Sequence, residues 1–331
     1  MRGPDGQSLF LGSVVIGSVV LLGYLFLHSD GEAGVDAPVA VPRNMPTQAD
    51  RSMRYLKDVC AIGPRMSGSE GMRRQQQYLQ DHFTKLGGKV RLQQFEARHP
   101  LDGSRVPMAN MIVEWNPAAK ERVLICAHYD TRPFPDQDRK RPKGTFIGAN
   151  DGGSGVAVLC ELAHHLPNVQ TRYGVDFVLF DGEELVFDTN RDPYFLGSEH
   201  FAREYTSQPL PYRYRWGVLI DMVGDSNLQI YREKYSYGWN DTRPLVDDIW
   251  NTAKRLGVNE FIARSGYEIR DDHLALHDIA KIPTCDIIDF DYPRFGAASY
   301  WHTEADTPDK CSGASLAKVG WVLLEWVQKV K

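Results

Sequence analysis

The sequence predicts a three-layer α/β domain, in which a mostly parallel, twisted central sheet has helices on both faces. Four short apolar runs have the length and composition of strands that are buried on both sides of a sheet. Helical patterns separate these runs, and strands that alternate with helices are typical of a parallel sheet covered on both faces. The four interior strands are expected at residues 123–127, 175–180, 217–220 and 284–288.

Two further strands are expected before the interior ones, at residues 89–95 and 109–115, because both segments alternate between apolar and polar side chains. Six helices complete the pattern. The second of them has Ser69 as its N-cap and Gly87 just after its end, which supports its boundaries. The helices are expected at residues 51–59, 70–86, 156–166, 195–205, 244–256 and 315–330.

The composition is that of a globular protein. Of the 331 residues, 42% are hydrophobic and 24% are charged. A net charge of -5 provides no general attraction for a phosphate backbone, so we expect no nucleic-acid partner. One large domain is expected over residues 47–331, preceded at residues 31–46 by a flexible linker rich in Gly, Ala, Pro and Asp.

Residues 1–30 have the pattern of a transmembrane anchor or a signal. Positions 9–27 carry no charge, and a mostly apolar run of this length approaches the roughly 20 residues of a membrane-spanning helix. Arg2 precedes the run, and Asp30 and Glu32 follow it, so the positive-inside rule places the domain outside the cytoplasm. A signal cleaved near residues 37–40 is the alternative. In both cases we expect an exported domain, in a periplasmic, extracellular or lumenal compartment.

Polar side chains follow three of the interior strands where each strand ends. His128 comes after the first, Glu183 and Glu184 after the second, and Asp221 after the third. In open α/β sheets, ligands bind outside the carboxyl ends of the strands. Asp151 opens the helix between the first two of these strands, and we expect it at the same edge.

His302, after the last interior strand and a long loop, completes a set of two imidazoles and three carboxylates with His128, Asp151, Glu184 and Asp221. Such a set suits zinc with one coordination position left open. Adjacent Glu183 and Glu184 point different ways in an extended or turning backbone, so one can bind metal while the other acts as a general base. Taken singly, each residue could be a solvated turn or a helix cap. Five of them at one edge favour a metal site.

Five motifs occur in order along the chain: His128-Tyr129-Asp130, Gly148-Ala149-Asn150-Asp151, Phe180-Asp181-Gly182-Glu183-Glu184, Leu219-Ile220-Asp221 and Trp301-His302-Thr303. Together they resemble the M28 clan of zinc aminopeptidases and its glutaminyl cyclase branch. The likeness covers about residues 50–330. It implies a zinc aminopeptidase fold, which is phosphorylase/hydrolase-like, and a zinc-dependent enzyme.

The resemblance also implies the metal ligands. In the two-zinc peptidases of this family, the residues matching His128, Asp151, Glu184, Asp221 and His302 bind metal, and the one matching Asp151 bridges the two ions. In the cyclases, the residues matching Asp151, Glu184 and His302 hold a single zinc. His128 and Asp221 would therefore hold a second zinc only in a peptidase.

Three segments resemble the cyclase branch more than the peptidases. Residues 185–196 resemble the insert of the cyclases, although Phe187 stands where that insert usually offers a tryptophan. Asp271 matches the first acidic residue of a segment that, in cyclases, joins a hydrogen-bond network with the general base. Trp301 matches a wall of the cyclase pocket. The segment after His302 resembles the peptidases at least as well, so both activities stay open.

The expected function is that of a zinc-dependent glutaminyl-peptide cyclotransferase, which converts N-terminal glutamine to pyroglutamate and releases ammonia. Its partners would be peptide or protein N-termini, and we expect a monomer. The alternatives are a two-zinc aminopeptidase and a non-catalytic, membrane-anchored ectodomain. The catalytic residues would be Glu183, Asp221 and Asp271, and the substrate-binding residues Trp301, His273 and Phe187.

Overall fold

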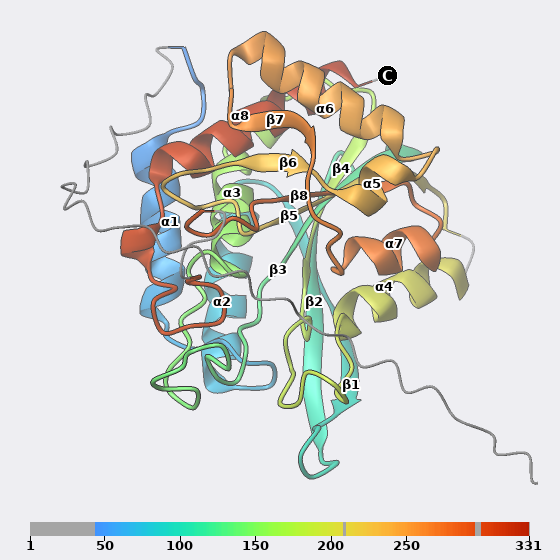
Figure 1. The fold of residues 1–331 in the computed structure, drawn as a ribbon. Helices are drawn as coiled ribbons and strands as arrows, with labels where there is room; N and C mark the ends of the chain where they lie inside the picture. Colours follow the sequence, from blue (N-terminus) through green and yellow to red (C-terminus); the bar gives the residue numbers. More distant parts are fainter. Residues whose placement is uncertain (1–43, 208–209, 295–298, 331) are drawn as a thin grey trace, which may run out of the picture. The chain divides into compact units, whose positions relative to one another are not determined.

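The structure is a computed structural model that describes residues 44–207, 210–294 and 299–330. A six-stranded sheet lies between two layers of helices (Figure 1). Its strands are β1 (Lys89–Arg98), β2 (Arg105–Trp115), β3 (Glu121–His128), β4 (Gly174–Phe180), β5 (Arg213–Asp221) and β8 (Thr284–Ile288). All six contain the strands that the sequence predicts.

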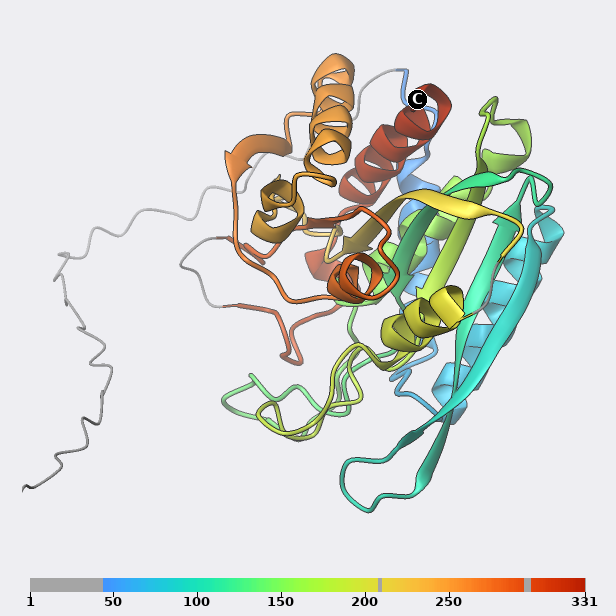
Figure 2. The ribbon, with the colours of Figure 1, turned by 90° about the vertical axis from the view of Figure 1, so that its right-hand side faces the viewer.

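The order of the strands is β1-β2-β4-β3-β5-β8. β3 pairs in parallel with β4 and β5, and β5 pairs in parallel with β8, whereas β2 is antiparallel to both of its neighbours. The sheet is therefore mostly parallel, as predicted, and only β2 runs the other way. Figure 2 shows that β1 and β2 form a long hairpin that extends beyond the rest of the sheet.

Alternate residues of the interior strands point into two separate cores. Val123 and Ile125 of β3 belong to the larger core, and Leu124 and Cys126 belong to the smaller one on the opposite face. This alternation places an apolar side chain on both faces of the sheet, which explains the continuous apolar runs in the sequence.

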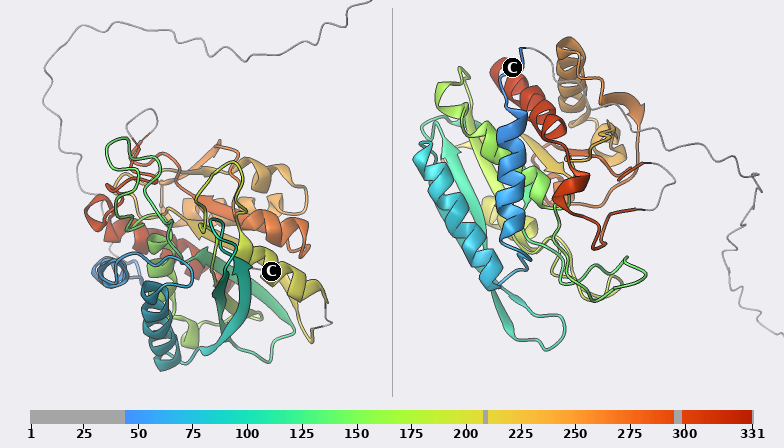
Figure 3. Two further views of the ribbon diagram at one scale, coloured as in Figure 1. Left: turned by 90° about the horizontal axis from the view of Figure 1, so that it is seen from below. Right: turned by 90° about the vertical axis from the view of Figure 1, so that its left-hand side faces the viewer.

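The larger core is covered by five helices, three of which lie toward the viewer in the right-hand view of Figure 3: α1, α2 and α8. The smaller core is covered by α4 and α7. The helices are α1 (Ala49–Ala61), α2 (Glu70–Lys85), α3 (Gly153–Leu162), α4 (Leu196–Ser207), α5 (Lys234–Gly238), α6 (Arg243–Leu256), α7 (His273–Asp278) and α8 (Gly313–Lys329).

Three parts of the fold differ from the prediction. The short helices α5 and α7 are not among the six predicted helices. α3 begins at Gly153, three glycine- and serine-rich positions before the predicted start, and ends at Leu162. A second, two-stranded parallel sheet of β6 (Ile230–Arg232) and β7 (Phe261–Ser265) was not predicted. β6 has only three residues, and in β7 polar and charged side chains follow Phe261 and Ile262, so neither strand shows an apolar run.

The expected membrane segment cannot be compared with the structure. Residues 1–30, and the linker residues 31–43, lie outside the described part of the chain. Among the residues that are described, none of the helices has the length and apolar character needed to cross a membrane.

Candidate metal centre and active site

The candidate site lies at the carboxyl ends of the parallel strands. His128 is the last residue of β3 and Asp221 the last residue of β5. Glu183 and Glu184 lie in the turn that follows β4, and Asp151 lies just before α3. His302 comes from the long loop between β8 and α8. The structure brings all six side chains together, as the strand-end pattern predicts.

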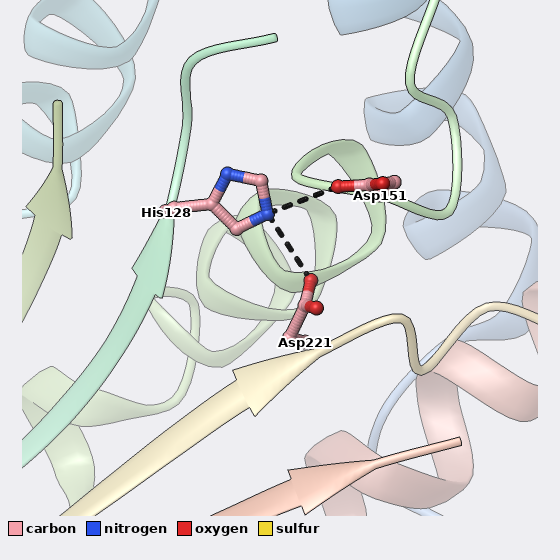
Figure 4. A group of neighbouring side chains, drawn as sticks. All are labelled: His128, Asp151 and Asp221. Atoms are coloured by element: carbon pink, nitrogen blue, oxygen red, sulfur yellow. Dashed lines mark hydrogen bonds and ion pairs between the residues drawn. The ribbon is translucent and has the colours of Figure 1, made fainter. Parts of the chain in front are cut away.

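One group of possible ligands contains His128, Asp151 and Asp221. Nε2 of His128 lies 3.2 Å from Oδ1 of Asp221 and 3.3 Å from Oδ1 of Asp151 (Figure 4). The ligand atoms of the three residues lie within 4.8 Å of one another, and all three residues are buried.

The second group contains Asp151, Glu184 and His302. Nε2 of His302 lies 2.8 Å from Oε1 of Glu184 and 3.4 Å from Oδ2 of Asp151. These ligand atoms also lie within 4.8 Å of one another. Asp151 therefore faces the two imidazoles with its two oxygens, which is the arrangement of a carboxylate that can serve either group or bridge both.

The donors of the second group fit a zinc ion. Oδ2 of Asp151 is buried and accepts no hydrogen bond in the described part of the chain. Burial, together with the charge of Glu184, raises the pKa of Asp151 to about 6, because two carboxylates share a space that excludes water. A divalent cation bound between the two carboxylates would offset their electrostatic repulsion. Imidazole and carboxylate groups both bind zinc, and three protein ligands with a fourth position left open are typical of catalytic zinc sites.

The two adjacent glutamates point in different directions because the chain turns sharply after β4. Gly182 has a φ of 75°, which favours glycine. Asp130 then holds the turn, since its two carboxylate oxygens accept the backbone N–H groups of Glu183 and Glu184 at 3.2 and 3.0 Å. The Glu184 side chain faces His302, whereas Oε2 of Glu183 lies 3.8 Å from Nδ1 of His128.

The environments of the two glutamates shift their pKa values apart. Burial raises the pKa of Glu183 well above its usual range, and the charge of Glu184 adds to the effect although His128 opposes it. Burial acts in the same direction on Glu184, but the charge of His302 and Arg132 outweighs it and lowers the pKa to about 2. Glu184 thus suits a ligand, and Glu183 suits a group that accepts and releases a proton.

A cavity of about 450 Å³ opens onto this group. Glu183, Asp221 and Asp271 line it, and burial and the charge of Asp221 raise the pKa of Asp271 well above its usual range. Trp301 also lines the cavity, and its ring stacks on that of His302 at a centroid distance of 3.8 Å. The remaining wall combines apolar and aromatic side chains with charged ones. The apolar and aromatic side chains include Met222, Tyr267, Ile269, Ile288 and Phe290, and the charged ones are Arg132, Lys234, Glu268 and Arg270.

The structure does not bring His273 or Phe187 to the cavity, so their expected substrate contacts need correction. The His273 side chain is fully buried behind it, with Nε2 at 3.5 Å from Oε2 of Glu233. Phe187 turns away toward the β1–β2 hairpin, where its ring lies 4.9 Å from that of His99. Neither side chain is placed to touch a molecule in the cavity.

Several residues at the site have no role in the sequence prediction. Asp306 accepts the backbone N–H groups of Asn150 and Asp151 and so orients the turn that carries Asp151. Arg132 and Asp136 contact Glu184 and His302. A carboxylate behind a ligand histidine is a general feature of metal sites, so acidic residues near His302 were the signal to look for. Their distance along the chain gave no indication of which one makes the contact.

Comparison with known proteins gives a consistent picture. The model of peptidase family M28 matches residues 110–327. A crystal structure of Fimbriiglobus ruber glutaminyl cyclase is 41% identical to this chain, covers 89% of it and 98% of its own chain, and superposes with a TM-score of 0.82. A leucine aminopeptidase precursor from Bacteroides thetaiotaomicron is 31% identical, with coverages of 88% and 100% and a TM-score of 0.78.

Sequence relatives include both activities. The glutaminyl-peptide cyclotransferase of Bothrops jararaca is 25% identical over 297 residues, which are 80% of this chain and 76% of that protein. Three bacterial relatives match over shorter stretches, and this chain spans 58%, 47% and 38% of their lengths. The last of these is an aminopeptidase of Bacillus subtilis.

Proposed function

Because this chain belongs to peptidase family M28, we propose that it is a zinc-dependent glutaminyl-peptide cyclotransferase. It would convert the N-terminal glutamine of peptides or proteins to pyroglutamate and release ammonia. The observation that carries the proposal is the carboxylate of Glu183, which lines the cavity beside Glu184 and Trp301 and has a neighbouring imidazole, that of His128, at 3.8 Å. The similarity to the Fimbriiglobus ruber cyclase over 89% of the chain supports it.

We place a single zinc on Asp151, Glu184 and His302. All three residues line the cavity, whereas His128 does not. Zinc bound there would act as a Lewis acid on the γ-carbonyl oxygen of the glutamine and make its carbon more electrophilic.

The residues of the chain would do the rest. The aromatic and apolar wall around Trp301 would hold the glutamine side chain folded back on its own α-amine and keep water from competing. Glu183 would take a proton from the α-amine as its nitrogen forms a bond to the γ-carbonyl carbon. As the bond from that carbon to the amide nitrogen breaks, Glu183 would return the proton to the leaving ammonia. Asp221 and Asp271 would keep Glu183 in place.

An aminopeptidase is the second candidate, because His128, Asp151 and Asp221 form another group that could hold a metal. With two metals, Glu183 would take its proton from a water molecule rather than from an amine. The same cavity would then hydrolyse the peptide bond after the first residue.

A paired assay separates the two candidates. The purified protein is given a glutamine-leading dipeptide, with release of ammonia as the readout, and in parallel an aminoacyl anilide, with release of the amine. Bound metal is counted by elemental analysis. We expect ammonia release, no anilide cleavage and about one zinc per chain. Anilide cleavage with two metals would establish the aminopeptidase, and an inert protein without metal would exclude both enzymes.

We also propose that residues 9–27 anchor the protein in a membrane, with a monomeric catalytic domain on the extracytoplasmic side. Their uncharged, apolar composition and the charges that flank them support this. Fractionation of the source cells should find the protein in the membrane pellet, resistant to carbonate and open to protease from outside. Recovery of a shortened soluble chain would identify a cleaved signal instead. Light scattering of the catalytic domain without detergent should give the mass of a monomer.

A further inference from the structure

We propose that Asp136 and Arg132 are positioning residues that hold His302 and Glu184 in the orientation that binds zinc. Both lie on the loop between β3 and α3, residues 129–152, and neither belongs to the five motifs of the sequence. The inference rests on the zinc site of the proposed function. It concerns the affinity for the ion rather than the reaction that follows.

The four side chains form a closed ring of contacts. Oδ1 of Asp136 lies 3.2 Å from Nδ1 of His302 and 2.8 Å from Nε of Arg132. Nη1 of Arg132 lies 3.2 Å from Oε1 of Glu184, and that oxygen in turn lies 2.8 Å from Nε2 of His302. The Arg132 backbone N–H also donates to Oε2 of Glu184 at 3.1 Å. Each ligand is therefore held by a group on the same short segment.

The ring is largely shielded from water, so its contacts are weakly screened. The side chains of Arg132, Glu184 and His302 are between 2% and 5% exposed, and that of Asp136 is 30% exposed. The guanidinium is supported further by Tyr194, whose hydroxyl lies 3.4 Å from Nη2. In such surroundings a guanidinium that bridges two carboxylates keeps both ionised and fixes their orientation.

His302 needs such support more than the other ligands. It has a φ of 53°, an uncommon value for a residue other than glycine. It lies on the loop between β8 and α8 and belongs to neither a strand nor a helix. The loop after β3 contacts His302 at two points. Asp136 lies beside its ring, and the Gln137 backbone N–H donates to its carbonyl oxygen at 3.1 Å. A carboxylate close to Nδ1 favours the proton on that nitrogen and so leaves the Nε2 lone pair free for a metal.

The test measures zinc affinity directly. Apo protein, prepared with a chelator and then dialysed, is titrated with zinc in competition with a chromophoric chelator. We expect Asp136→Ala to weaken zinc binding by about 10- to 100-fold, the range seen when such outer partners are removed. Asp136→Asn keeps a side-chain oxygen close to Nδ1 of His302 and should recover part of the loss. In Arg132→Lys the single ammonium group cannot bridge the carboxylates of Asp136 and Glu184 as the guanidinium does, so zinc binding should also become weaker.

Asp138→Ala is the matched control. Asp138 lies on the same loop and accepts the Lys140 and Arg141 backbone N–H groups and that of Glu304, but it touches neither ligand. It should change zinc affinity by less than about 3-fold, and the melting temperatures of all apo variants should stay close together if the loop folds normally. An excess of zinc should restore turnover to Asp136→Ala if its role is to set affinity.

Each result is decisive. Equal zinc affinity in Asp136→Ala and the unmodified chain overturns the inference, as does an equal loss in Asp138→Ala, which would mean that loop folding alone matters. If the unmodified chain binds no zinc, the inference and the proposed function both fail. If it binds zinc but releases no ammonia from a glutamine-leading dipeptide, the proposed function alone fails.

Discussion

Glu183 and Glu184 are neighbours along the chain, yet their surroundings give them different chemistry. The turn held by Asp130 points one toward His302 and the other into the cavity. Cationic neighbours lower the pKa of Glu184 to about 2 despite its burial, whereas burial keeps the pKa of Glu183 high. Two identical side chains thus differ enough in their contacts to suit the two proposed roles, ligand and base.

Replacing the base should separate catalysis from metal binding. Glu183→Gln keeps the shape of the side chain but cannot take a proton, so we expect ammonia release to fall by about 100- to 10,000-fold. Zinc content should stay unchanged, because Glu183 is not in the proposed ligand set. Glu184→Gln should instead lose the zinc. Loss of metal in Glu183→Gln would mean that the two roles are reversed.

Glu161 illustrates a buried charge that serves stability rather than the site. Its side chain is fully buried on α3, and its oxygens accept Nε and Nη2 of Arg51, both at 2.6 Å, and the Gln48 backbone N–H at 2.8 Å. Burial would raise its pKa, but the hydrogen bonds from His165 and Arg51 outweigh this and lower the pKa to about 2. The ionised form is therefore favoured in the folded protein.

Stability should depend on pH accordingly. The contribution of Glu161 is fully present above the ordinary pKa of 4.5 and is lost as the pH falls toward 2. We expect Glu161→Gln to lower the free energy of unfolding by about 2 kcal/mol at pH 7, in line with a hydrogen bond to a charged group. Urea unfolding at pH 7 and pH 3 should show this difference shrinking. If the difference in free energy of unfolding between Glu161→Gln and the unmodified chain were the same at both pH values, the ionised carboxylate of Glu161 would not be its source.

At the level of elements, the start of α3 sets the position of Asp151. Every residue of this helix is buried, and its first turn packs against the ends of β3 and β5. Gly155 is required there, because a Cβ would lie 2.6 Å from the Ile220 carbonyl oxygen and 2.8 Å from Cβ of Ala127. The glycine allows the helix to approach the two strands that carry His128 and Asp221.

We expect Gly155→Ala to push α3 away from the sheet. The overpacking should destabilise the fold by about 2 kcal/mol, and zinc affinity should fall because Asp151 moves with the helix. Gly238→Ala is a suitable control, since a Cβ at the end of α5 would meet nothing within 4 Å. Urea unfolding and zinc titration of both variants test this. Equal stability of the two would show that the helix adjusts without cost.

The elements differ in how well the sequence predicted them. The interior strands β3, β4, β5 and β8 were predicted because continuous apolar runs follow from burial on two faces, a property that each strand shows by itself. The small sheet of β6 and β7 was not predicted. Its short strands pair with each other and each buries one apolar side chain, Ile230 or Phe261, in the larger core, which is too little to leave an apolar run in the sequence.

For the whole molecule, the proposed zinc would connect distant parts of the fold. Its ligands come from the turn before α3, the turn after β4 and the loop after β8. An ion that binds only when these three segments meet should stabilise the folded state by mass action.

Removal of zinc should therefore lower the melting temperature. At a free zinc concentration of about 1,000 times the dissociation constant, the expected stabilisation is roughly 4 kcal/mol. Calorimetry of the protein with zinc, after chelation and after zinc is restored should show the loss and its recovery. Asp151→Asn should show no response to zinc. If the melting temperature of the unmodified chain does not change when zinc is removed or restored, the three segments hold no ion.

The sequence by itself determined the sheet, the edge at which the site lies, and the imidazoles and carboxylates gathered there, because burial and strand ends leave a pattern in neighbouring residues. Only the tertiary structure decided which glutamate faces His302, that Arg132 and Asp136 contact Glu184 and His302, and that His273 and Phe187 lie away from the cavity. These are contacts between residues far apart in the chain. They depend on how the loops fold against each other, which no local pattern records.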